Sequence, residues 1–189
     1  DQLKAFGVLP PKGILLEGRP GCGKTMLVRA LANEAHCEVI SVSGGSFSSR
    51  YAGDGAKEIH RLFSSAAMVS PAIIFIDEID AICMNPVLTN QLLTEMDGFV
   101  KENNVIVIGA TNHLDAIDYR LRREGRFSRI LSIPLPGEAE RRKIFELYVN
   151  QLPKADIDSI DYNTLVFYTQ DFSGAGIKDI VNTAALFAC

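Results

Sequence analysis

The sequence lacks several features that would place it in other classes of protein. It has no apolar run near the roughly 20 residues that cross a bilayer, so we expect no membrane contact from these residues. Its four cysteines form no CxxC pair, which favours free thiols in a reducing, cytosol-like compartment. The three histidines form no HExxH motif, so no peptidase site is expected here. With 19 Lys and Arg against 23 Asp and Glu, no nucleic-acid partner is expected.

Hydrophobic side chains make up 47% of the 189 residues, which is typical of a globular protein. Short apolar segments alternate with longer segments of helical periodicity. The predicted strands are 13–17, 39–42, 72–76, 105–110 and 130–135. Strands that are apolar throughout and alternate with helices predict an α/β fold, with a parallel five-stranded sheet flanked by helices.

The pattern changes after the prolines at 134 and 136. Residues 138–150 predict a charged amphipathic helix, 171–176 a turn and 177–188 an apolar helix, with no further strand. We therefore expect a large α/β domain over residues 1–136 and a small helical domain over 137–189.

Residues 18–25 read GRPGCGKT, which fits GxxxxGK[ST] between a predicted strand and a predicted helix. Glycines let consecutive backbone N–H groups surround a phosphate, and the helix N-terminus favours negative charge. Lys24 would reach the β- and γ-phosphates, and the Thr25 hydroxyl would bind Mg²⁺. The alternative is a glycine-rich structural turn, which the strand–loop–helix context disfavours. The expected nucleotide-binding set is Pro20, Gly21, Cys22, Gly23, Lys24, Thr25 and Met26.

Two further predicted strands end in polar residues. In IIFIDE, Asp77 would bind Mg²⁺ and Glu78 would polarise the attacking water. In VIVIGATN, Asn112 could orient this water and sense the γ-phosphate. Each has a plainer alternative, because buried strands normally end in polar residues and Thr-Asn is also an ordinary turn or helix cap.

Four arginines, at 122, 123, 126 and 129, cluster around Gly125 and Phe127. They could form a solvated basic loop. The alternative is an arginine supplied across a subunit boundary, where a guanidinium stabilises charge developing on phosphate.

Together these residues resemble the AAA family of hexameric ring ATPases over nearly the whole chain. The resemblance rests on GRPGCGKT, IIFIDEIDAI, NQLLTEMDGF, GATN and GRFSR, in the order of the family. Residues 43–47, 53–56, 90–99 and 173–188 look most like the FtsH-type ATP-dependent zinc metalloproteases. The branch of Cdc48 (valosin-containing protein) and the meiotic or severing branch are close competitors.

The resemblance implies roles that spacing alone does not give. Arg126 and Arg129 match two arginine fingers that reach the ATP of a neighbouring subunit. Tyr51, Ala52 and Gly53 match a pore loop that grips a translocating polypeptide, although Tyr51 could instead pack on its own domain. Gly174 and Ala175 match a turn of the lid domain that approaches adenine, and Ile144 and Tyr148 match positions that pack on the base.

The implied function is Mg²⁺-dependent hydrolysis of ATP in a homohexamer that pulls polypeptide through a central pore. An FtsH-like parent would carry a membrane anchor and a protease domain outside these residues. Some positions depart from the family, among them Arg19, Cys22, Ser128 and Gly176. Arg19, Ser128 and Gly176 motivate a second hypothesis, an assembly module that binds ATP but hydrolyses it poorly. A third, remodelling of nucleic acid, is disfavoured by the acidic balance.

The segment 83–89 is shorter than in FtsH-like relatives by about a dozen residues. Either the protein lacks the second pore loop, or residues around Asn85 and Pro86 are missing from the sequence. We expect the second, because a shortened link would strain the following helix.

Overall fold

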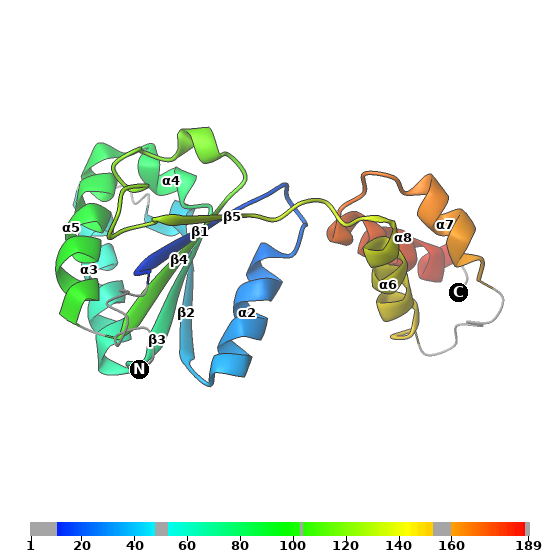
Figure 1. Cartoon of the computed structure of the whole chain (residues 1–189), viewed down its shortest axis with the longest axis horizontal. Coiled ribbons are helices and arrows are strands. Elements are labelled where there is room, and N and C mark those ends of the chain that lie inside the picture. Colours follow the sequence, from blue (N-terminus) through cyan, green and yellow to red (C-terminus); the bar gives the residue numbers. More distant parts are fainter. Residues whose placement is uncertain (1–10, 48–52, 103, 153–159, 188–189) are drawn as a thin grey trace. The chain divides into compact units, whose positions relative to one another are not determined.

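The computed structural model describes residues 11–47, 53–102, 104–152 and 160–187, which form two compact units (Figure 1). The first unit holds residues up to Glu17 together with Lys24–Ser132. The second holds Gly18–Gly23 and the residues from Ile133 onward. Each unit is described separately below.

The first unit is built on the predicted parallel sheet. Its strands are β1 (Gly13–Glu17), β2 (Glu38–Ser43), β3 (Ala72–Asp77), β4 (Val105–Thr111) and β5 (Arg129–Ser132). They lie in the order β2-β3-β4-β1-β5, and every pair is parallel. This confirms the predicted fold class. The fifth strand ends before the predicted residue 135, because the prolines at 134 and 136 have no N–H to donate to a neighbouring strand.

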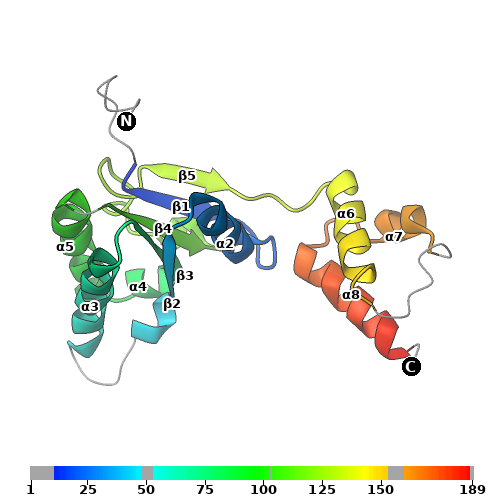
Figure 2. The same cartoon turned by 90° about the horizontal axis from the view of Figure 1, so that it is seen from below.

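Helices cover both faces of this sheet (Figures 1 and 2). The helical segments of the first unit are α2 (Lys24–Ala35), η1 (Gly44–Phe47), α3 (Asp54–Met68), α4 (Asp80–Cys83), α5 (Pro86–Glu102) and η2 (Leu114–Ala116). Alternate residues of β3 enter opposite cores: Ile74 packs on the side of α3 and α5, and Phe75 on the side of α2. This alternation explains why β3 is apolar throughout.

The link between α4 and α5 is short and is held by side-chain hydrogen bonds. Asn85 Oδ1 accepts a hydrogen bond from the N–H of Val87 at 2.9 Å, and Thr89 Oγ1 donates to the carbonyl of Ile82 at 3.2 Å. Asn85 thus caps α5, and Pro86 occupies the first helical position, where proline is favoured. These hydrogen bonds describe the link as the given sequence has it, so the expectation that residues are missing there stays a prediction.

The second unit contains α6 (Glu138–Val149), α7 (Tyr162–Tyr168) and α8 (Gly174–Phe187). They pack around Phe145, Val166 and Ile177. Helix α8 begins at Gly174, inside the predicted turn 171–176, because Ser173 Oγ accepts a hydrogen bond from the N–H of Gly176 at 3.2 Å and caps the helix. The prediction missed α7. In neither unit is a described helix long and apolar enough to cross a membrane.

Candidate functional site

Lys24, the first residue of α2, is only 8% exposed. Its Nζ donates a hydrogen bond to Asn112 Oδ1 at 2.6 Å. Asn112 follows β4, and β4 pairs with β1, the strand that precedes residues 18–23. The fold thus brings together two predicted site residues that are far apart in the sequence.

Thr25 and Asp77 form a second such pair. Thr25 Oγ1 donates to Asp77 Oδ2 at 3.0 Å, from the first turn of α2 to the last residue of β3. A hydroxyl and a carboxylate are hard oxygen ligands, and Mg²⁺ in nucleotide sites is commonly held by one or two protein oxygens plus phosphate and water. The two side chains therefore fit the predicted magnesium site.

Glu78 has an unusual backbone conformation. Its φ is 52°, in the left-handed region, and its N–H donates to Asp77 Oδ1 at 3.0 Å. Ser43, at the end of β2, donates its hydroxyl to Glu78 Oε2 at 3.3 Å. A non-glycine residue held at positive φ costs about 1–3 kcal/mol, and such residues are concentrated at functional sites. Ser43 had no predicted role, although its position at a strand end could have indicated one.

Close approach of the backbone also fixes Glu78. A Cβ atom on Gly44 would lie 2.3 Å from the carbonyl oxygen of Glu78, so only glycine fits there without a shift. We refer to Lys24, Thr25, Asp77, Glu78 and Asn112 as the strand-end cluster.

Hydrogen bonds of the buried Thr111 hydroxyl, which were not predicted, hold the backbone on both sides of Asn112. Thr111 is 1% exposed, and its hydroxyl donates to Asp80 Oδ1 at 2.7 Å. The same hydroxyl accepts a hydrogen bond from the N–H of His113 at 2.9 Å. Asn112 therefore lies between Thr111 and His113, which this second hydrogen bond joins.

Residues 18–23 belong to the second unit and make a tight turn. The N–H of Cys22 donates to the carbonyl of Arg19 at 3.4 Å, and Gly21 and Gly23 have φ values of 77° and 90°. Glycine adopts these values without the strain that a side chain would add. Pro20 in this turn, and Met26 in the first unit, are exposed.

Two of the four residues expected near adenine, Gly174 and Ala175, lie beside this turn within the second unit, and Ile144 lies beside Gly174. The N–H of Ala175 donates to the carbonyl of Gly21 at 3.2 Å. A Cβ atom on Gly174 would be 3.4 Å from that carbonyl oxygen and 3.7 Å from Cδ1 of Ile144. Tyr148 lies on α6, with the Lys178 ammonium 5.7 Å from its ring centroid.

The two proposed arginine fingers differ in their contacts and exposure. Arg126 donates from Nε and Nη2 to the Asp97 carboxylate of α5, at 2.9 and 2.6 Å. Its Nη1 donates to the carbonyl of Arg120 at 2.6 Å, and the hydrogen bond to Asp97 raises the pKa of Arg126 above its ordinary value. Arg129 begins β5 and is exposed. The pairing of Asp97 with Arg126 was not predicted, because no local sequence pattern connects the two residues.

The pore-loop prediction falls mainly outside the described residues, which exclude Tyr51 and Ala52. Gly53 is exposed, with φ of 90°, and precedes α3. Its role stays a prediction.

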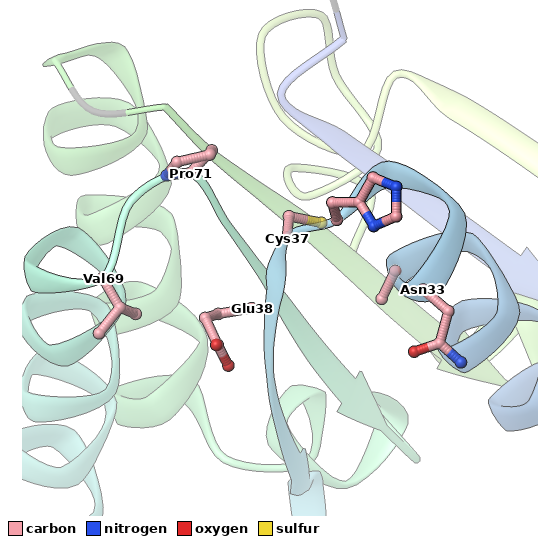
Figure 3. A pocket seen from close by; sticks show the side chains of 7 residues that line it. Asn33, Cys37, Glu38, Val69 and Pro71 are labelled. Carbon is pink, nitrogen blue, oxygen red and sulfur yellow. The ribbon is translucent and has the colours of Figure 1, made fainter.

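A cavity of about 310 Å³ lies elsewhere in the first unit (Figure 3). It is lined by the C-terminal part of α2 and by Cys37, Glu38, Val69 and Pro71. Glu38 begins β2 and Pro71 precedes β3, so this cavity is at the opposite end of those strands from Ser43 and Asp77. No group of three or more His, Cys, Asp or Glu in the described ranges could hold a metal ion.

Comparison with known proteins agrees with this geometry. Residues 14–135 match the ATPase family associated with various cellular activities (AAA). The chain is 41% identical over 200 residues to a proteasome-activating nucleotidase of Sulfurisphaera tokodaii, covering 100% of this chain and 50% of that protein.

Two other relatives have a similar sequence identity to this chain. The chain is 40% identical over 196 residues to the ATP-dependent zinc metalloprotease FTSH 7, chloroplastic, of Arabidopsis thaliana, covering 97% of this chain and 24% of the relative. It is 40% identical over 195 residues to the human ATPase family gene 2 protein homolog A, covering 97% of this chain and 22% of the relative. The chain thus spans half or less of the length of these relatives. The family match covers most of the chain, and the chain belongs to the AAA family of ATPases.

Proposed function

We propose that the chain is the ATPase module of a homohexameric ring and hydrolyses ATP to ADP and phosphate with Mg²⁺. The observation that carries this proposal is the strand-end cluster, in which Lys24 bonds to Asn112 and Thr25 bonds to Asp77. These contacts gather a cation, a hydroxyl, an amide and a carboxylate, and the cation and the hydroxyl are the last two residues of the sequence that fits a phosphate-binding loop.

Each residue has a distinct role in this proposal. The backbone N–H groups of residues 20–26 surround the phosphates, and Lys24 neutralises charge on the β- and γ-phosphates. Thr25 and Asp77 hold Mg²⁺, which when bound withdraws charge from the transferring phosphoryl group. Glu78 orients the attacking water, and Asn112 senses the γ-phosphate. Ile144, Tyr148, Gly174 and Ala175 contact adenine.

The remaining groups act between subunits. Arg126 and Arg129 of one chain stabilise the phosphoryl charge in the site of the next. An arginine has five N–H donors, so Arg126 can keep its three described bonds and still donate to a phosphate. Tyr51, Ala52 and Gly53 grip the substrate polypeptide at the pore.

The names of the relatives support polypeptide as the substrate. Two of them are a proteasome-activating nucleotidase and an ATP-dependent zinc metalloprotease, both connected with protein degradation. We favour an FtsH-like parent with a membrane anchor, with a Cdc48-like or severing-type remodeller as the alternative. In either case the chain unfolds or translocates proteins, and no nucleic-acid partner is needed.

The test is ATP turnover per protomer, measured over a hundredfold range of protein concentration, with Lys24→Ala and Glu78→Gln as controls. A ring with fingers supplied by a neighbour gives turnover that rises with concentration and is lost in both variants. Glu78→Gln is expected to keep ATP binding, because Lys24 and the loop remain intact.

Two outcomes would contradict the proposal. Turnover that is independent of concentration would argue against fingers from a neighbour. Negligible turnover with tight ATP binding, even in a version fused to a hexamerising scaffold, would favour the assembly module instead.

A further inference from the structure

Arg120 stands out because it connects the arginine-bearing loop to α5. We refer to residues 118–129 as the arginine loop. Nη1 of Arg120 donates to Asn90 Oδ1 on α5 at 2.9 Å. Its backbone carbonyl accepts the 2.6 Å hydrogen bond from Nη1 of Arg126. One residue therefore contacts both the helix and the first of the proposed fingers.

The rest of the Arg120 side chain fixes its own turn. Nε lies 3.1 Å from each carboxylate oxygen of Asp118, and Nη2 donates to Oδ2 at 2.7 Å. The N–H of Arg120 also donates to Asp118 Oδ1 at 2.8 Å. These bonds make a rigid fork, of the kind that arginine forms with carboxylates, and they hold the pKa of Asp118 below its ordinary value.

Helix α5 thus holds the arginine loop at two points. Asn90 binds Arg120, and Asp97, about two helical turns further along, binds Arg126. Asp97 accepts both hydrogen bonds from the Nε–Nη2 edge of the Arg126 guanidinium. The carbonyl of Arg120 accepts the hydrogen bond from Nη1 of Arg126, and the side chain of Arg120 donates its own Nη1 hydrogen bond to Asn90.

We propose that Arg120 and Asn90 form a clasp that sets the orientation of Arg126 for its action on the neighbouring nucleotide. Arg120 is a positioning residue in this proposal, which rests on the proposed function above. A surface ion pair alone would explain the fork with Asp118, but it would not require the contact with Asn90 or the bond to Arg126.

The proposal is tested in the full-length protein by mixing subunits. Arg120→Ala protomers keep Lys24 and Glu78 but have a loosened arginine loop. Glu78→Gln protomers cannot hydrolyse ATP but have an intact loop. Arg120→Ala alone is expected to lower kcat by roughly tenfold to a hundredfold, with little change in KM for ATP, because only the geometry of a distant donor changes.

Adding Glu78→Gln protomers should then raise turnover per Arg120→Ala protomer, because an intact loop now faces some of its sites. A residue with a merely structural role would not be rescued in this way. Arg129→Ala protomers mixed with Glu78→Gln serve as the reference. Rescue of both variants supports the clasp.

If Arg129→Ala is rescued and Arg120→Ala is not, the clasp is wrong and the ring mechanism stands. If neither is rescued, the ring mechanism fails and the clasp fails with it. Wild-type kcat in Arg120→Ala would also overturn the clasp.

Substitutions at Asn90 provide an independent test if Arg120→Ala does not fold. Asn90→Asp keeps an acceptor for Arg120 and should retain kcat within about twofold. Asn90→Leu has a similar size but no acceptor, and kcat should fall as far as in Arg120→Ala. The double variant Asn90→Leu with Arg120→Ala should be no slower than either single variant, because both break the same contact. Additive losses would contradict the clasp.

Discussion

The strand-end cluster and the arginine loop hold their charged groups in different ways. In the cluster, Asp77 ends β3 and Lys24 begins α2, so the secondary structure itself places them. In the arginine loop, Arg126 follows no strand and is held by Asp97. A residue at a strand end moves only if the sheet moves, whereas a residue in a loop depends on each of its contacts. We expect substitutions to act locally in the first region and through distant partners in the second.

The largest effect is expected at Lys24, in the strand-end cluster. Lys24→Ala removes a buried cation and leaves Asn112 Oδ1 without its described partner. Both ATP binding and turnover should be lost, because no other side chain of the cluster carries positive charge. A fluorescent ATP analogue measures ATP binding, and the release of phosphate measures turnover. Tight binding in this variant would show that the loop backbone alone holds the nucleotide.

The second-largest effect, a loss of turnover, is expected in the arginine loop. Arg129→Ala should lower kcat on the order of a thousandfold if it acts as a finger, with ATP affinity nearly unchanged. Arg123→Ala is the matched control, because Arg123 is an exposed arginine of the same loop that stacks 4.9 Å from the ring centroid of Tyr119. Steady-state turnover of the assembled protein measures both. Equal losses in the two variants would indicate a general effect of loop charge.

Gly44 allows a smaller and more local test of the cluster. In Gly44→Ala the new Cβ would lie 2.3 Å from the carbonyl oxygen of Glu78, so the backbone at Glu78 must shift. We expect kcat to fall by roughly tenfold to a hundredfold while ATP still binds. Gly45→Ala is the control, since its Cβ would meet only Ser43 Oγ at 3.6 Å. Equal kcat in both variants would mean that Glu78 tolerates displacement.

The difference between residues placed by secondary structure and residues held by distant contacts also explains what could be predicted from the sequence. The strands and the residues at their ends were predictable, because apolar runs mark a buried parallel sheet and the phosphate-loop motif fixes Lys24 and Thr25. In α3, the spacing of Ile59, Leu62 and Phe63 is that of one helical face, and all three are buried.

Contacts between distant segments were not predictable in this way. Asp97 and Arg126 are joined only because α5 and the arginine loop pack side by side, and no periodicity records that pairing. His60 bonds to the buried Glu95 between α3 and α5 at 2.9 Å for the same reason. Short elements such as α4 were missed as well, since four residues are too few for a helical period to be recognised.

The smallest effect is a pH dependence of the free energy of unfolding, caused by Asp118 in the arginine loop. The hydrogen bond from Arg120 lowers the pKa of Asp118 below its ordinary value of 3.8. A carboxyl whose pKa is lower in the folded state stabilises that state above pH 3.8, and the contribution is lost as the pH falls through the lower folded value. Asp118→Asn should therefore lower the free energy of unfolding slightly at neutral pH, and the difference from wild type should shrink in acid. Urea unfolding at several pH values measures this, and a difference that stays constant with pH would show that the charge of Asp118 does not stabilise the loop.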